Sequence, residues 1–292
     1  MRMMTACKPA IGALLLWLAI QPATAHPAHE LLVQRKTAEL EAQPYRAELY
    51  LQRGELHRDH EEFDEAAADY RRARELDPAL PGLALAEAAL HLDLDDAAGA
   101  IAKLDAVLAA DPRNLDALTL RGRALSAAGR HDEAAVDLGR GIEAGLGMAP
   151  LSPEMYLRHA RALTASTPPR PDAALETLER GLAELGRPIS LELAALRVEI
   201  EAKRIDAALQ RVDRLAAGAN RPAGWLERRG EILESAGRPG EAQAAYTAVL
   251  EAHRALPATK QGSAAVRERE NRVRLSLRRL QSLQPTHSEN PR

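Results

Sequence analysis

Small and bulky apolar residues recur along this chain at an interval of 34 positions. With Ala47 as position 1, Gly54 takes position 8, Ala66 position 20, Tyr70 position 24 and Pro78 position 32. The same positions further along hold Ala88, Ala100, Leu104 and Pro112, then Gly122, Ala134 and Leu138, and near the C-terminus Gly230, Ala242 and Tyr246. Two helices approach closely only where side chains are small, and proline ends a helix. The pattern therefore predicts successive pairs of antiparallel helices.

The register departs from this pattern in its fourth and fifth intervals. Leu196 stands at position 8 of the fifth, where a small residue is expected. In the fourth, Ala160 and Ala174 fit positions 8 and 20 only if about four residues are inserted around 145–153 and about two in 167–172. We expect longer connections between helices at both places.

The spacing resembles that of the tetratricopeptide repeat family, and the resemblance covers roughly residues 44–257. It implies an all-α fold, a right-handed α-solenoid of antiparallel helix pairs with about six repeats and about thirteen or fourteen helices in one domain. The composition agrees, because only 3% of the residues are aromatic and no run of alternating β-branched residues predicts a strand.

Both ends of the repeat array have features of caps. Residues 29–43 resemble half a repeat, so we expect 26–43 to form an N-terminal capping helix. Apolar residues at helical spacing predict a C-terminal capping helix within 258–284, and a polar tail, 285–292, is expected to be disordered. Capping helices of this kind cover the exposed faces of an open helical stack.

The first 25 residues have the features of a cleaved secretory signal. Arg2 and Lys8 precede a short apolar run, 11–20, and Ala23-Thr24-Ala25 offers small residues before a cleavage site. The apolar run has about half the roughly 20 residues that a membrane-spanning helix needs. We therefore expect the mature protein to begin at His26 and to be periplasmic or secreted.

Removal of residues 1–25 takes away two of the 39 basic residues and none of the 42 acidic ones, which leaves a net charge of −5. This balance disfavours binding to nucleic acid or to anionic lipid. It also removes Cys7, the only cysteine. Because Cys7 precedes the apolar run, we expect no lipid anchor and no stable attachment to a membrane.

Signatures of catalysis are missing from the sequence. It contains no Gly-x-Ser-x-Gly motif, no phosphate-binding Gly-x-x-x-x-Gly-Lys loop and no His-Glu-x-x-His pair. We therefore expect neither enzymatic activity nor a cofactor.

Two groups of histidines are candidate metal ligands. His57 and His60 lie beside Glu61 and Glu62, but position 11, which His57 occupies, holds leucine in other repeats, and zinc needs three or four ligands. The sequence therefore predicts a packing role for His57, no metal site there, and a capping role for the carboxylates at the start of the next helix. The alternative is a copper chelate at the mature N-terminus, formed by His26 and His29.

Members of the tetratricopeptide repeat family hold a peptide or a helix in a groove lined by positions 2, 5, 9, 12 and 13 of the first helices. On this resemblance we predict a partner-binding surface made of leucines at position 5, arginines at position 9 and one isoleucine at position 12: Leu51, Leu85, Arg123, Leu157, Arg161, Leu193, Arg197 and Ile200. A guanidinium group suits a carboxylate, so the expected partner is a protein with an acidic or C-terminal segment, or an amphipathic helix. The alternative is that the arginines only pair with neighbouring glutamates.

These observations predict an exported scaffold for interactions between proteins. Two other functions stay open at the level of sequence: an accessory copper protein that uses His26 and His29, and a docking subunit for an exported enzyme.

Overall fold

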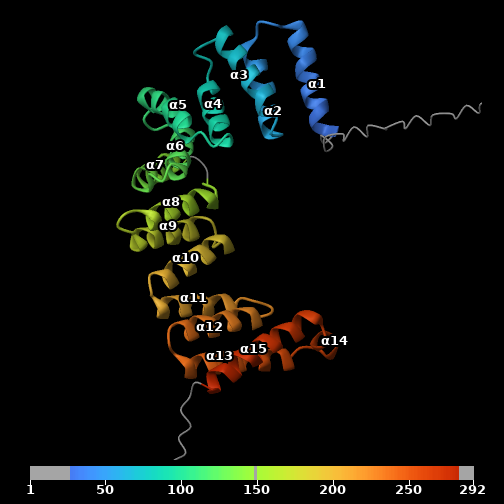
Figure 1. The fold of residues 1–292 in the computed structure, drawn as a ribbon, viewed down its shortest axis with the longest axis vertical. Coiled ribbons are helices and arrows are strands. Elements are labelled where there is room, and N and C mark those ends of the chain that lie inside the picture. Colours follow the sequence, from blue (N-terminus) through green and yellow to red (C-terminus); the bar gives the residue numbers. More distant parts are fainter. Residues whose placement is uncertain (1–26, 148–149, 283–292) are drawn as a thin grey trace, which may run out of the picture. The chain divides into compact units, whose positions relative to one another are not determined.

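The computed structural model describes residues 27–147 and 150–282, and every regular element in these ranges is a helix (Figure 1). The predicted all-α class and its helix pairs are thereby confirmed. The described residues form fifteen helices, one more than the upper expectation, because a four-residue helix precedes the last one. The proposed signal, 1–25, together with His26 and the tail, 285–292, lies outside the described residues.

The contacts divide the chain into two compact units, Met1–Ala86 and Glu87–Arg292. The first unit contains α1 (Pro27–Ala42), α2 (Ala47–Asp59) and α3 (Phe63–Leu76), and α4 (Leu83–Asp93) contains the point of division. The helices of the second unit are α5 (Ala97–Ala110), α6 (Leu115–Ala127), α7 (His131–Gly145), α8 (Pro153–Ala165), α9 (Pro171–Glu184), α10 (Ile189–Glu201), α11 (Ile205–Ala217), α12 (Ala223–Ser235), α13 (Pro239–Arg254), α14 (Ala258–Gln261) and α15 (Ala264–Ser282).

Close approach of paired helices depends on the small residue at position 8. A Cβ atom added to Gly54 of α2 would lie 2.5 Å from Cε1 of Tyr70, the position 24 residue of α3. Gly122 of α6 meets Leu138 of α7 in the same way, also at 2.5 Å. Carbon atoms in contact are normally about 3.5–4.0 Å apart, so no larger side chain fits without separating the helices.

The turn inside most repeats uses a left-handed residue at position 15. Glu61, Asp95, Gly129, Lys203 and Gly237 have φ values between 58° and 72°. This conformation lets the chain reverse within a few residues, and it costs little only for glycine. In the fourth repeat, where the sequence predicts extra residues, the longer connection 166–170 replaces this turn.

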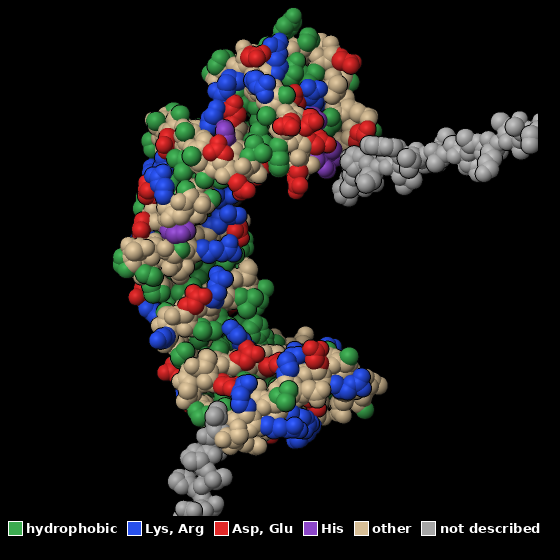
Figure 2. Space-filling view, in the orientation of Figure 1, with side chains coloured by type: hydrophobic (Ala, Val, Ile, Leu, Met, Phe, Trp, Pro, Cys, Tyr) green, Lys and Arg blue, Asp and Glu red, His purple; other side chains and the backbone are tan. Residues whose placement is uncertain are grey.

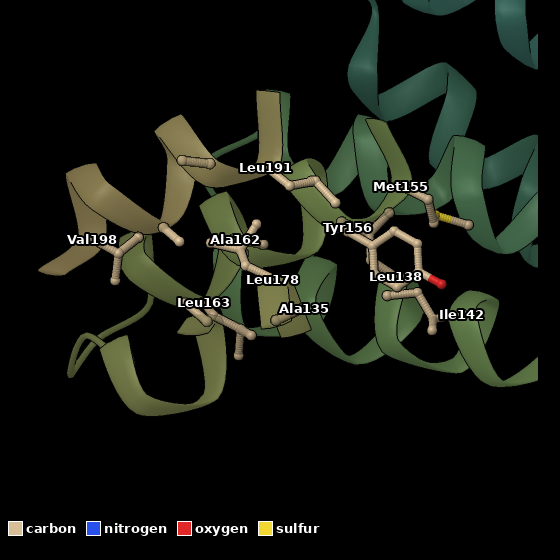
Figure 3. Close-up of a cluster of buried hydrophobic side chains, with 14 of the residues drawn as sticks. Ala135, Leu138, Ile142, Met155, Tyr156, Ala162, Leu163, Leu178, Leu191 and Val198 are labelled. Carbon is tan, nitrogen blue, oxygen red and sulfur yellow. The ribbon is translucent and has the colours of Figure 1, made fainter. Parts of the chain in front are cut away.

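The core of the middle repeats lies where α7, α8, α9 and α10 meet (Figure 3). Tyr156 of α8 is fully buried there, and leucines from the neighbouring helices surround it, including Leu138, Leu178 and Leu191. Each of these helices contributes one apolar face to the cluster, as expected for a repeat that buries its core only against its neighbours.

A polar pair links the two helices of each of the first four repeats. It joins position 7 of the first helix to position 23 of the second, where most contacts are apolar. The pairs are Arg53 with Asp69, Glu87 with Lys103, Arg121 with Asp137, and His159 with Thr177. Small and apolar positions alone do not predict these pairs.

The C-terminal helix α15 packs against the last repeat. Val273 and Leu280 are its buried residues, and its arginines pair with glutamates of α12. Arg269 donates to Glu227 over 2.8 Å, and Arg279 donates to Glu234 over 2.9 Å. Among the described residues, no helix combines the length and the apolar character needed to cross a membrane.

Candidate functional site

Two of the predicted arginines line one cavity of about 270 Å³. Arg161 of α8 and Arg197 of α10 stand at its rim, with Leu157 and Ala160 of α8 beside them. Both arginine side chains are exposed, whereas Leu157 is half-buried and rests against the core. The repeat register therefore places these two arginines next to each other, as the sequence predicted.

Arg197 also lines a second cavity, of about 380 Å³, that extends from α10 to α12. Leu193, which is 47% exposed, lines this cavity together with Trp225, Arg221 and Arg228. We call the two cavities together the arginine groove. Figure 2 shows Lys and Arg side chains gathered along the stretch that contains α8 and α10. The arginine groove thus combines exposed positive charge with apolar surface.

The arginines of the groove are only partly neutralised. Glu154 lies 3.1 Å from Arg158 and 3.6 Å from Arg161, so one carboxylate pairs with two guanidinium groups. Burial lowers the pKa of Arg158, and the nearby charges of Arg123 and Arg161 lower it further. Within 27–147 and 150–282, no carboxylate forms an ion pair with Arg197. The alternative of local pairing therefore describes Arg161 and does not describe Arg197.

The other four predicted residues line neither cavity. Arg123 is half-buried on α6. Leu51 and Leu85 are half-buried and belong to the first unit, and neither lines the arginine groove. Ile200 is half-buried against the apolar cluster of the last repeats and lines neither cavity. Position in the repeat predicts which side of a helix a residue occupies, but not how deeply its neighbours cover it.

Trp225 was not among the predicted residues, nor were Arg221 and Arg228, although all three line the groove. A signal for them exists in the sequence, because Trp225 is the only tryptophan beyond the proposed signal and has arginines four residues before and three residues after it. A half-buried tryptophan beside arginines is typical of binding surfaces.

A separate cluster forms in the first unit, where α1 lies against α2. His29 of α1, His57 in the last turn of α2 and Glu62 before α3 bring their ligand atoms within 4.8 Å of one another. Nδ1 of His57 is 2.6 Å from Oε2 of Glu62, and Nε2 of His29 is 3.4 Å from the same oxygen. The ring of His60 stacks on His29, with 3.3 Å between the ring centroids.

The capping role predicted for Glu62 is wrong. Glu62 is the N-cap residue of α3, but its side chain makes no cap hydrogen bond. Its carboxylate turns instead toward the two histidines, and the hydrogen bond with His57 holds the pKa of Glu62 below its usual value. His57 is half-buried, as a packing residue would be, yet its ring nitrogen contacts a carboxylate rather than an apolar neighbour.

Comparison with protein families finds two matches. Residues 47–80 and residues 85–153 each match a model described as tetratricopeptide repeat. No curated protein matches the sequence.

Solved structures with a similar fold include a tetratricopeptide repeat protein from Parabacteroides merdae, at 15% identity and a TM-score of 0.52, over 87% of this chain and 92% of that one. Another is pilF of Pseudomonas aeruginosa, at 20% identity and a TM-score of 0.51, over 82% and 97% of the two chains. Yeast Tom70 is 18% identical, with a TM-score of 0.50, over 77% of this chain and 44% of that one. At these identities the likeness shows the fold alone.

Proposed function

Because the chain is a tetratricopeptide-repeat protein, we propose that it is an exported scaffold that binds another protein in the arginine groove. Proteins of this family bind other proteins or peptides, so a protein partner follows from the fold. The finer proposal is that the partner presents an acidic side chain or a free C-terminal carboxylate together with an apolar residue.

One observation carries this proposal: Arg197 lines both cavities of the groove and has no carboxylate partner among the described residues. Glu201 lines the smaller cavity with Arg197 but forms no ion pair with it. A guanidinium group without an ion pair can bind a carboxylate through two parallel hydrogen bonds. Leu193 and Trp225 supply apolar surface beside it. An extended segment along α8, α10 and α12 would meet the charge and the apolar wall in succession.

Export is proposed on the features of residues 1–25, where two basic residues, a short apolar run and small residues precede His26. The expected compartment is the periplasm or the exterior. N-terminal sequencing of the protein recovered from its native host tests this, and a start at Met1 would contradict it.

Binding is tested with a peptide library in which each sequence has either a free or an amidated C-terminus. We expect peptides with an acidic residue or a free carboxylate near a leucine to bind the wild-type protein. The double variant Arg161→Glu, Arg197→Glu should bind them at least tenfold more weakly, because two charge-assisted contacts become repulsive. Fluorescence anisotropy measures both affinities.

The matched control is Arg113→Glu, Arg254→Glu, which reverses two exposed arginines that line neither cavity. Its peptide affinity should stay within about twofold of the wild-type value. Neither double variant should change the midpoint temperature of thermal unfolding by more than a few degrees. Equal loss of affinity in both double variants would show a non-specific charge effect, and unchanged affinity in the groove variant would reject the proposed site.

A further inference from the structure

Three potential metal ligands meet in the first unit from three different parts of the chain. His29 lies near the start of α1, His57 lies at the end of α2, and Glu62 lies in the turn that leads to α3. No local helix geometry requires His29 to lie near the other two, since 28 residues separate it from His57. The cluster therefore depends on how α1 packs against the first helix pair.

The spacing of the ligand atoms suits a small tetrahedral ion. Around Zn²⁺, with bonds of about 2.1 Å, neighbouring ligand atoms are about 3.4 Å apart. Oε2 of Glu62 lies 2.6 Å from Nδ1 of His57 and 3.4 Å from Nε2 of His29, and all three ligand atoms lie within 4.8 Å of one another. Small side-chain rotations would bring the set to this geometry.

His29 is poorly satisfied by the protein alone. Its side chain is only 4% exposed, Nδ1 has no hydrogen-bond partner, and the contact from Nε2 to Glu62 is long at 3.4 Å. A buried polar atom without a partner costs free energy. A cation between Nε2 and Glu62 would give this nitrogen a stronger partner than the long contact of 3.4 Å, and the stacked ring of His60 restricts the orientation of His29.

The next repeat contains a natural comparison. His91 and Asp96 stand at the same repeat positions as His57 and Glu62, and Nδ1 of His91 lies 2.8 Å from Oδ2 of Asp96. Asp96 also caps its helix by accepting from the N–H of Gly99 over 2.8 Å. The histidine–carboxylate contact is thus a local feature of the helix pair, and the first repeat differs because Glu62 does not cap and a second histidine reaches it.

We propose that His29, His57 and Glu62 form a binding site for Zn²⁺. Two imidazoles and one carboxylate are a ligand set that Zn²⁺ accepts, and water would take the fourth position. The ion would take the place of the hydrogen bond between Nδ1 of His57 and Glu62. Nε2 of His57, the ring nitrogen that would not bind the ion, lies 4.0 Å from Asp69. Arg53 donates a hydrogen bond to Asp69, so this carboxylate is held where it can orient the His57 ring. The bound ion would fasten α1 to the helix pair α2–α3.

The test is calorimetric titration of the full chain with zinc chloride. We expect one saturable site in the wild-type protein, and an affinity at least tenfold lower in His57→Ala and in the conservative variant Glu62→Gln. His91→Ala, which removes the equivalent histidine of the next repeat, should retain the wild-type affinity. Titration with Co²⁺ gives an independent readout, because tetrahedral coordination produces visible absorption bands that Glu62→Gln should abolish.

His26→Ala separates this site from an N-terminal chelate. It should bind zinc as the wild-type protein does, and circular dichroism checks that every variant remains helical. The proposal is overturned if the wild-type protein shows no saturable binding, or if His57→Ala and Glu62→Gln bind as tightly as His91→Ala. It is also overturned if His26→Ala alone loses binding.

Discussion

At the scale of single residues, His159 is a half-buried base between two helices of the fourth repeat. It occupies position 7 of the fourth repeat, and its Nδ1 lies 3.1 Å from the hydroxyl of Thr177. Burial lowers the pKa of His159 to about 4, and the positive charge of Arg170 acts in the same direction. The imidazole is therefore neutral in the folded protein at neutral pH.

This shift makes stability depend on pH. In the unfolded chain the pKa of His159 has its ordinary value of about 6.5, whereas in the folded protein the pKa is about 4. Between these values the unfolded state binds more protons, so lowering the pH destabilises the fold, by on the order of 3 kcal/mol in total from this residue. Urea unfolding at several pH values between 4 and 7 measures the effect.

The comparison variant is His159→Asn, which keeps a polar group near Thr177 but does not titrate. Its free energy of unfolding should fall less steeply between pH 6.5 and 4 than that of the wild-type protein, and the two should run parallel above pH 7. Parallel curves over the whole range would show that His159 titrates normally in the folded state.

At the scale of helices, an ion network joins α9, α10 and α11. Arg211 is 2% exposed, and it donates to Glu192 over 2.6 Å and to Glu199 over 2.7 and 3.0 Å. Glu179 of α9 accepts a further hydrogen bond from Arg211. Burial alone would raise the pKa of Glu192, but hydrogen bonds from Arg211 and Arg187 outweigh it and lower that pKa.

Removing the cation of this network should be costly. Arg211→Leu leaves Glu192 and Glu199 buried without their main counter-ion, so the free energy of unfolding should fall by about 3–5 kcal/mol. Arg229→Leu is the matched change, because Arg229 pairs over 3.0 Å with Asp213, whose side chain is 54% exposed. The free energy of unfolding of the Arg229→Leu variant should fall by less than about 1 kcal/mol. Equal losses, measured by urea unfolding, would mean that the arginine side chains matter for packing rather than for charge.

The repeat pattern predicted the helix pairs because one local constraint, a small residue opposite a bulky one, recurs with each pair. Gly54 with Tyr70 and Gly122 with Leu138 meet as their positions require. The network of Arg211 was not predictable in this way. Position 7 of its own repeat is Ala195, so Arg211 at position 23 lacks the usual partner and takes Glu192 and Glu199 instead, which depends on side-chain orientation and depth.

The two candidate sites also differ in how far the repeat pattern predicts them. Arg161 and Arg197 share a repeat position on neighbouring first helices, so the register predicted that they lie next to each other, and in the structure both line one cavity. The proximity of His29 to His57 was missed because α1 precedes the first complete repeat, and the pattern does not determine which residues of α1 face α2. The contacts of residues at the ends of a repeat array cannot be predicted from the repeat pattern alone, because they depend on tertiary packing.

At the scale of the whole molecule, each part of the stack draws its stability from adjacent helices. The middle and last repeats of the second unit each have an apolar cluster, built from helices that are neighbours in sequence. In the first unit, Tyr70 packs on Gly54 between α2 and α3. With interactions confined to neighbours, a local defect is expected to loosen its own surroundings before it loosens distant helices.

Two equivalent substitutions test whether stability is local in this sense. Gly54→Val in the first unit and Gly230→Val in the second place a branched side chain against the tyrosine at position 24, Tyr70 or Tyr246, where an added Cβ already has no room. Each should destabilise its own helix pair by several kcal/mol through overpacking. Hydrogen exchange followed by mass spectrometry should show faster exchange in α2–α3 for the first variant and in α12–α13 for the second. Because the two substitutions are chemically the same, a uniform increase over all helices in both variants would demonstrate one cooperative unit instead.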